Sequence, residues 1–253
     1  MKNTEKTPEK KTDVALVTGA SRGIGRAIAA RLAREGHAVL VNYASNEPQA
    51  AEVVREITQA GGRALAVRAD VSKPDEVKHL FDVAERTWGP VTVLVNNAGV
   101  GQHQETIAQT SDALYERIMS INVRGTFNTL REASQRMPAG SRIVNVSTSV
   151  VGTLNPGYAV YAASKAAVET MSRVFANELR GRDIRVNVVA PGPAATELFF
   201  EGKSQELIDA IIKRAPMERL GTVEDMVRVV AFLVGEESGW VHGQVLRVNG
   251  GMV

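Results

Sequence analysis

The stretch from Asp13 to Gly25, DVALVTGASRGIG, joins a short apolar run to a loop that contains three glycines. Residues 13–18 are rich in valine and leucine, which predicts a buried strand. Residues 26–35 carry apolar side chains at helical spacing and are followed by Gly36, which predicts a helix and its end. The stretch therefore predicts a strand, a glycine loop and a helix in direct succession.

A glycine loop in this position suits a dinucleotide. Glycines allow the tight turn and the close approach of a pyrophosphate, and the helix N-terminus offers free N–H groups. The spacing is not the common G-x-G-x-x-G, and there is no G-x-x-x-x-G-K-[ST] loop, so nucleotide hydrolysis has no support. The alternative interpretation is a simple turn without a ligand. The residues expected to contact the dinucleotide here are Gly19, Ser21, Arg22, Gly23, Ile24 and Gly25.

The rest of the chain alternates short apolar runs with helical patterns. Strands are predicted at 38–43, 64–69, 91–95, 142–146, 184–189 and 245–248, and helices at 48–60, 74–88, 112–136, 157–180, 204–214 and 223–234. Near-continuous Val, Ile and Leu predicts strands that are buried on both faces. The pattern predicts an α/β fold: a Rossmann-like, doubly wound parallel sheet of about seven strands with helices on both faces.

Length and composition limit the possibilities further. The 253 residues suit one domain, expected at 13–253 after a disordered tail at 1–12, with a substrate lid at about 193–216. The absence of cysteine excludes disulfides, a cysteine nucleophile and thiolate metal sites, and we expect no metal. Thirty basic and 28 acidic residues are scattered, which disfavours nucleic acid, and no apolar run is long enough for a membrane span. The polar N-terminus lacks a signal peptide, so we expect a cytoplasmic protein.

The end of the predicted strand at 38–43 bears on the choice of cofactor. An acidic residue here would hold the ribose of NAD, but the chain reads Asn42, Tyr43, Ala44 and Ser45, with no carboxylate before Glu47. These four residues are expected to contact the cofactor. Arg22 is the candidate partner for a 2′-phosphate, so NADP(H) is favoured. Alternatively, Arg22 is a solvated loop residue. After the next strand, Asp70 either receives the adenine amino group or starts the loop before the following helix, and Val71 beside it is also expected to contact the cofactor.

Tyr161 and Lys165 stand four residues apart, so on a helix their side chains share one face. A neighbouring ammonium lowers the pKa of a phenol by about 1 to 3 units, which makes Tyr161 a candidate proton donor to a carbonyl oxygen. The alternative is a surface pair without a function.

These motifs together resemble one known family. T-G-x-x-x-G-x-G at 18–25, N-N-A-G at 96–99 and Y-x-x-x-K at 161–165 are similar to the compact short-chain dehydrogenase/reductases. The exit sequence at 190–193 with Thr196 and the ending at 243–251 extend the resemblance over residues 13–253. It implies that Tyr161 is the catalytic acid/base and that Lys165 lowers its pKa and binds the nicotinamide ribose. It also implies that Asn122 distorts its helix, so that its carbonyl holds a water in the proton relay. The further cofactor-binding residues that it implies are Asn97, Ala98, Gly99, Pro191, Gly192 and Thr196.

The family also has a serine about 13 residues before the tyrosine, and here three hydroxyls compete for that place. An ungapped alignment places Thr148 there, whereas the family's S-x-x-G pattern matches Ser149; Ser147 is less favoured. Both Thr148 and Ser149 stay candidates for holding the substrate oxygen.

The resemblance implies an NADPH-dependent reductase of ketones or aldehydes, similar to 3-oxoacyl carrier-protein reductases or broad carbonyl reductases. The same machinery could run as an alcohol dehydrogenase, and the alternative from another class is a non-catalytic dinucleotide sensor or regulatory subunit. The apolar lid suggests an apolar carbonyl substrate, possibly an acyl thioester, although these residues could simply pack on the core. Arg180, Arg182 and Arg185 could meet an acidic carrier protein, or could be a solvated helix end. The family commonly forms tetramers, so we expect a homo-tetramer, with a dimer as the second choice.

Overall fold

The computed structural model describes residues 13–101 and 104–253, so the predicted tail at 1–12 lies outside the described residues. In these ranges the strands form one parallel, seven-stranded sheet with the order β3-β2-β1-β4-β5-β6-β7. The strands are β1 (Val14–Val17), β2 (Ala38–Tyr43), β3 (Arg63–Arg68), β4 (Val93–Asn96), β5 (Arg142–Val146), β6 (Arg185–Pro191) and β7 (Val245–Val248). The doubly wound α/β prediction is confirmed.

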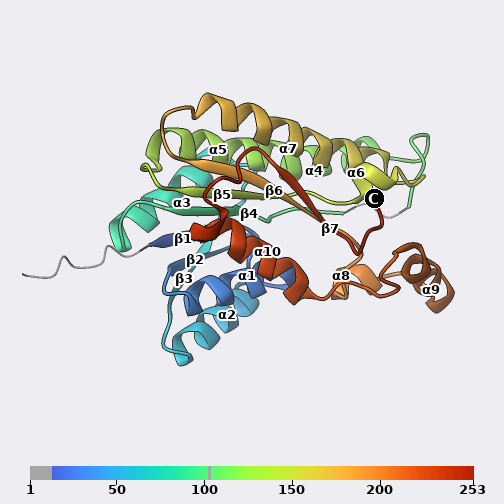
Figure 1. Ribbon diagram of the computed structural model, residues 1–253, viewed down its shortest axis with the longest axis horizontal. Coiled ribbons are helices and arrows are strands. Elements are labelled where there is room, and N and C mark those ends of the chain that lie inside the picture. The colour runs from blue at the N-terminus through green and yellow to red at the C-terminus, as the bar shows by residue number, and fades with distance from the viewer. Residues whose placement is uncertain (1–12, 102–103) are drawn as a thin grey trace, which may run out of the picture.

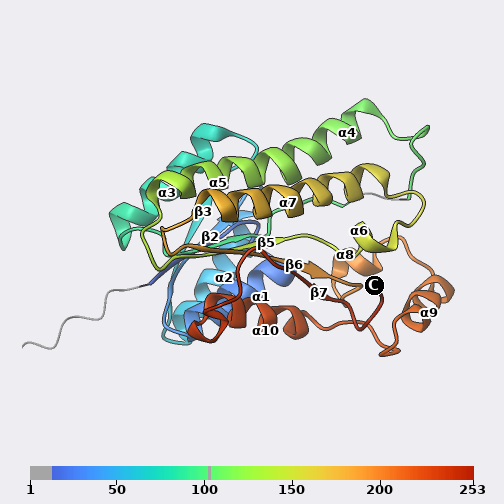
Figure 2. The ribbon, with the colours of Figure 1, turned by 45° about the horizontal axis from the view of Figure 1, so that its top comes forward.

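Helices cover both faces of the sheet (Figures 1 and 2). One layer contains α1 (Gly23–Arg34), α2 (Glu47–Gln59) and α10 (Val223–Val234); the other contains α3 (Pro74–Thr87), α4 (Asp112–Ile118), α5 (Gly125–Arg136) and α7 (Ala159–Glu178). Each layer closes its own core, built on Ile28, Leu32 and Leu233 on one side and on Leu80 and Phe81 on the other. Among the described helices, none is both long and apolar enough to span a membrane.

The valine-rich strands are the inner strands of the sheet. Every residue of β1, β2, β4 and β6 is buried, whereas the outermost strands β3 and β7 are partly exposed. Val17 pairs with Val41 on one side and with Val95 on the other, so β1 lies between β2 and β4. The chain moves outward from β1 to β3 and then returns to β4 on the other side. This reversal leaves a crevice at the carboxyl ends of β1 and β4, where ligands bind in sheets of this type.

The prediction of one continuous helix over 112–136 is wrong in one respect. The segment forms α4 and α5 joined by a π-helical turn, Met119–Arg124. Such a turn is a rare insertion of one residue confined to a single turn, and residues 119–124 are ordinary for a helix, so the sequence pattern did not reveal it. Three short elements were also not predicted: α6 (Val150–Thr153), α8 (Glu197–Phe200) and the 3₁₀ turn Glu236–Ser238. The lid helix α9 (Gln205–Arg214) begins one residue later than predicted.

Candidate active site

The glycine loop turns tightly against the end of β4. Gly19 and Gly23 have φ of 59° and 57°, which favour glycine. A Cβ on Gly19 would lie 2.8 Å from the Cα of Ala98, and one on Gly25 would lie 2.4 Å from the side-chain nitrogen of Asn97. Larger residues at 19 or 25 would therefore push the loop away from β4.

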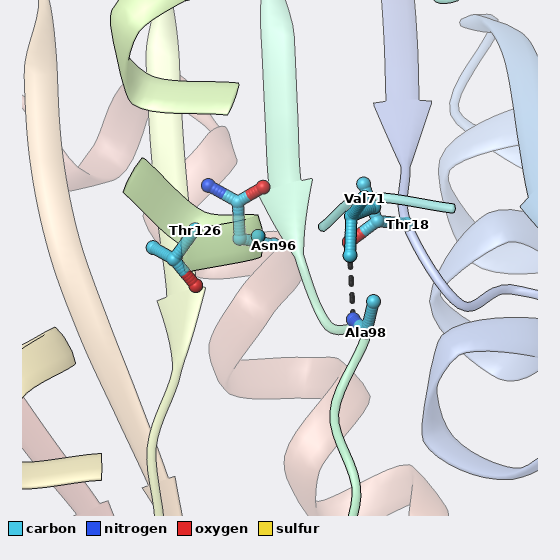
Figure 3. A pocket seen from close by; sticks show the side chains of 6 residues that line it. Thr18, Val71, Asn96, Ala98 and Thr126 are labelled. Carbon is cyan, nitrogen blue, oxygen red and sulfur yellow. Dashed lines mark hydrogen bonds between the residues drawn. The ribbon is translucent and has the colours of Figure 1, made fainter. Parts of the chain in front are cut away.

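Hydrogen bonds hold the loop to β4. The Thr18 hydroxyl accepts the backbone N–H groups of Asn97 (3.1 Å) and Ala98 (3.0 Å; Figure 3). The Asn97 side chain donates to the carbonyls of Thr18 (3.0 Å) and Gly19 (2.9 Å). These bonds use the side chain of Asn97 within the protein, so Asn97 shapes the crevice rather than extending freely into it.

The N-terminus of α1 faces this crevice without a cap of its own. Arg22 is the N-cap residue, its side chain makes no capping bond, and the first turn contains no acidic residue. No described heavy atom lies within 4 Å of a Cβ built on Gly23, so the backbone is open there. Free N–H groups and the positive helix end fit a pyrophosphate.

The end of β2 differs from the expected arrangement. Asn42 is 1% exposed: its side-chain oxygen accepts the Gly19 N–H (3.2 Å), and its nitrogen donates to the Ala69 carbonyl (2.9 Å). Tyr43 packs in the core. Both side chains are therefore structural here, whereas Ala44 and Ser45, like Arg22, are exposed at the crevice end of the strand.

Beyond β3, Asp70 shows the behaviour of a turn residue. Its carboxylate accepts the Ser72 N–H (2.9 Å), and its own N–H donates to the Glu76 carboxylate (2.7 Å). Val71 is buried beside Gly125, and both line a small pocket with Thr18, Asn96, Ala98 and Thr126 (Figure 3). Asp70 thus starts the loop before α3, one of the two roles that the sequence left open.

Tyr161 lies in the first turn of α7 and is hydrogen-bonded to Thr148 at the end of β5. Burial raises the pKa of Tyr161 above its usual value, and the Thr148 hydrogen bond lowers it in part. The expected fall in this pKa is therefore not seen. A raised pKa keeps the phenol protonated at neutral pH.

The other two hydroxyls of this segment have different partners. Ser149 donates to the Ala190 carbonyl (3.2 Å) and accepts from the Asn249 side chain (3.0 Å). Ser147 donates to the buried Glu169 carboxylate at 2.7 Å. Of the three, the structure brings Thr148 to the tyrosine.

Lys165 and Asn122 meet at Gly99. A Cβ on Gly99 would lie 3.2 Å from both the Lys165 ammonium nitrogen and the Asn122 side-chain oxygen. The Lys165 ammonium donates to the Val146 carbonyl at 2.7 Å, and burial lowers the pKa of Lys165 to about 8. Glycine at position 99 is what leaves room for these two side chains.

The side chain of Asn122, in the π-turn, joins three segments. It accepts from the Val100 N–H (2.8 Å) and donates to the Val100 carbonyl (3.0 Å) and the Ser164 hydroxyl (3.0 Å). Its carbonyl accepts from the Thr126 hydroxyl at 2.9 Å. The helix is distorted at Asn122, as the resemblance implies, and the side chain ties the distorted turn to α7.

The exit from β6 carries the remaining predicted residues. Pro191 ends the strand, and a Cβ on Gly192 would lie 2.7 Å from the Cα of Asn249, so the C-terminal segment packs tightly on this exit. The Thr196 hydroxyl accepts the Phe199 N–H (3.2 Å) at the start of α8. The predictions did not include Asn249, which supports Ser149; the ending Gly243–Gly251 was matched only as a pattern, without a role.

The arginines after α7 are mostly engaged inside the protein. Arg182 donates to the carbonyls of Ser134 and Met137 at the end of α5. Arg185 is buried and donates to the Gly235 carbonyl at 3.0 Å. These two residues cap helix ends. Of the three arginines, only Arg180 is exposed, so it is the one that could contact an acidic partner.

Comparisons with known proteins identify the family. Residues 19–253 match a family model described as enoyl-(acyl carrier protein) reductase. A short-chain type dehydrogenase/reductase of Picea abies is 49% identical, with 95% of this chain and 92% of that protein covered. The chain belongs to the short-chain dehydrogenase/reductase family.

Other members carry more specific names. An NADPH-dependent aldehyde reductase-like protein, chloroplastic, of Arabidopsis thaliana is 46% identical, with 95% of this chain and 94% of that protein covered. A 3-oxoacyl-[acyl-carrier-protein] reductase of Staphylococcus epidermidis is 39% identical, with 94% and 98% covered. Among solved structures, a blue fluorescent protein from a metagenomic library in complex with NADPH has a TM-score of 0.90 at 37% identity, with 95% of this chain and 98% of that chain covered.

Proposed function

We propose that this short-chain dehydrogenase/reductase is an NADPH-dependent reductase that transfers hydride to the carbonyl carbon of a ketone or aldehyde. The observation that carries the proposal is the pair formed by the protonated Tyr161 and the Thr148 hydroxyl, with Lys165 one turn along the same helix. Relatives named as an NADPH-dependent aldehyde reductase-like protein and a 3-oxoacyl-[acyl-carrier-protein] reductase support the substrate class. A dinucleotide sensor has no need of this set of groups.

When bound, NADPH supplies the hydride. Tyr161 donates its proton to the carbonyl oxygen, and Thr148 donates a second hydrogen bond to the same oxygen, so the product is the alcohol. The phenolate left on Tyr161 is stabilised by the Lys165 ammonium. Asn122 acts through its backbone carbonyl, which holds a water that returns a proton toward Lys165.

The crevice residues fit the cofactor. Ser21, Gly23, Ile24 and Gly25 would offer backbone N–H groups to the pyrophosphate, because the α1 terminus is uncapped, and Gly19 would let the loop approach it closely. Ala98 and Gly99 present backbone at the end of β4, and Pro191, Gly192 and Thr196 close the nicotinamide end. Residues 193–216 form the substrate lid. Arg22, Ala44 and Ser45 are exposed where the 2′-phosphate of NADP would lie.

Arg22→Ala is expected to weaken NADPH use about ten- to a hundredfold in kcat/KM and to leave NADH use unchanged, because only NADPH carries the phosphate that the guanidinium binds. Arg34→Ala, which removes an exposed arginine from the opposite end of α1, is the control and should behave as wild type. Steady-state kinetics with both cofactors check this, and an equal loss for NADPH and NADH contradicts the role of Arg22.

The pH dependence should follow Lys165. Its pKa of about 8 means that the ammonium is present below pH 8 and lost above it, while Tyr161 stays protonated throughout. We therefore expect kcat/KM for NADPH, which reports the free enzyme, to be level below about pH 8 and to fall about tenfold per unit above it. The Lys165→Arg variant stays cationic over this pH range, so its residual kcat/KM should not change with pH. A wild-type profile that is flat to pH 10 would exclude the ammonium as the required form.

One observation favours a second reaction: the matching family model is described as enoyl-(acyl carrier protein) reductase, which reduces a carbon–carbon double bond. NADPH and NADH oxidation should be followed by the nicotinamide absorbance against an acetoacetyl thioester, an aromatic aldehyde, a cyclic ketone and an enoyl thioester. Turnover of the carbonyl compounds without the enoyl thioester is expected. Turnover of the enoyl thioester alone would contradict carbonyl reduction and assign reduction of a carbon–carbon double bond instead. Cofactor binding without any turnover would favour a sensor.

We also infer a homo-tetramer. Apolar side chains are exposed on the outer helical layer, with Tyr115 on α4, Phe127 on α5 and Val174 on α7 each about half exposed. Contact with a second copy along these helices would cover them. Light scattering of the purified protein measures the mass that decides between tetramer and dimer.

A further inference from the structure

A cavity of about 320 Å³ lies between the lid and the loop that precedes α7, within the size range of ligand pockets. The face of α9 supplies Leu207, Ile211 and Arg214, which are spaced for one side of a helix. Asn155 and Tyr158 line the cavity from the loop opposite. Figures 1 and 2 show α9 at the same end of the molecule as α6 and the C-terminus.

The charges on the cavity wall are positive. Lys203, just before α9, and Arg214, at the end of α9, both line the cavity, and Leu207 and Ile211 lie between them in sequence. Among the described residues that line the cavity, none is acidic. Glu206 and Asp209 are exposed and do not line it, so the acidic side chains of α9 are directed elsewhere.

Neutral acceptors hold both cations in place. Both terminal nitrogens of Arg214 donate to the Asn155 side-chain oxygen at 3.1 Å. The Lys203 ammonium donates to the Phe199 carbonyl (2.6 Å) and lies 5.0 Å from the centre of the Phe199 ring. Neither cation forms an ion pair with a described residue, so each charge is oriented but not neutralised.

One residue of the cavity wall lies close to the reacting end of the site. Tyr158 lines the cavity and lies three residues before Tyr161. The two phenols interact electrostatically, and Tyr158 contributes to the raised pKa of Tyr161. A substrate whose carbonyl reaches Tyr161 would therefore extend past Tyr158 along the α9 face.

We propose that the substrate is an oxo compound with an anionic group, a carboxylate or a phosphate, separated from its carbonyl by an apolar segment. This inference rests on the proposed carbonyl reductase function. Arg214 binds the anion, Lys203 at the other end of α9 adds to the positive potential of the cavity, and Leu207 and Ile211 contact the apolar segment. The guanidinium fork suits carboxylate and phosphate alike, and charge-assisted hydrogen bonds are the stronger kind.

The test uses a series of methyl ketones that end in a carboxylate at increasing chain length, each paired with its methyl ester, and a phosphate-terminated analogue of the best length. The measured quantity is the ratio of kcat/KM for acid and ester, because each pair differs only in charge. We expect a ratio of about ten or more at one length, reduced toward one by high salt. A preference for the phosphate analogue over the carboxylate would identify phosphate as the natural group.

Arg214→Gln should lower the acid-to-ester ratio about tenfold, and Lys203→Gln should lower the same ratio by a smaller factor. Lys213→Gln, an exposed cation on α9 outside the cavity, is the matched control and should keep the ratio. Equal rates for acids and esters in the wild type would overturn this inference and leave the reductase function standing. Failure of every carbonyl compound would overturn both.

Discussion

Tyr161→Phe is expected to lower kcat about a thousandfold, while NADPH binding and the fold stay intact. The change removes only the hydroxyl, so the ring still packs beside Thr148 and Tyr158 and the protein loses its proton donor. Turnover of the best carbonyl substrate, a fluorescence titration with NADPH and the circular dichroism spectrum together measure the three quantities.

The matched control for this variant is Tyr115→Phe. Tyr115 lies on α4 and is 46% exposed, away from the residues that surround Tyr161. It should retain wild-type turnover. If Tyr161→Phe also kept wild-type turnover, another group would be the acid, and the proposed mechanism would be wrong.

The second large effect is expected at Thr148. Thr148→Val keeps the shape of the side chain and removes its hydroxyl, so the hydrogen bonds to Tyr161 and to the substrate oxygen are lost. We expect kcat to fall about a hundredfold, as for the loss of one donor to a developing oxyanion. Thr148→Ser retains the hydroxyl and should recover most of the activity. Steady-state kinetics on the three proteins provide the measurement.

Ser149→Ala separates the two candidate hydroxyls. Ser149 bonds to the Ala190 carbonyl and to Asn249, so its loss should reduce the free energy of unfolding by about 1 kcal/mol and change kcat little. Thermal unfolding and kcat are measured on the same preparation. The reverse result, an inactive Ser149→Ala and an active Thr148→Val, would assign the substrate oxygen to Ser149.

Much of the fold could be predicted from the sequence because inner parallel strands are buried on both faces. Runs such as 14–17 and 93–96 have almost no polar residue and alternate with helical patterns. Few folds other than a parallel sheet covered by helices are compatible with this pattern. The π-turn at Met119–Arg124 could not be predicted from the sequence pattern, because it is a rare insertion confined to one turn and its residues also suit an α-helix.

The site was predicted where the residue type itself limits the chemistry. Glycines at 19, 25 and 99 fill places where a Cβ would collide with neighbouring atoms, and Tyr161 and Lys165 share a helix face by their spacing. The choice between Thr148 and Ser149 depends on which neighbours each hydroxyl meets across strands. The roles of Asn42, Arg182 and Arg185 also depend on neighbours that are distant in sequence. Asn42 accepts a hydrogen bond from the glycine loop, and the two arginines donate to carbonyls at helix ends.

The most direct test of hydride transfer to a carbonyl follows an isotope. NADPH with deuterium at both C4 positions of the nicotinamide is incubated with the enzyme and its best ketone or aldehyde, and the product is examined by NMR and mass spectrometry. We predict one deuterium on the carbon that bears the new hydroxyl group. The Tyr161→Phe variant should form only the small amount of this labelled alcohol that its residual turnover allows. Deuterium on any carbon other than the one that bears the new hydroxyl group, or a product without deuterium, would contradict carbonyl reduction by this enzyme.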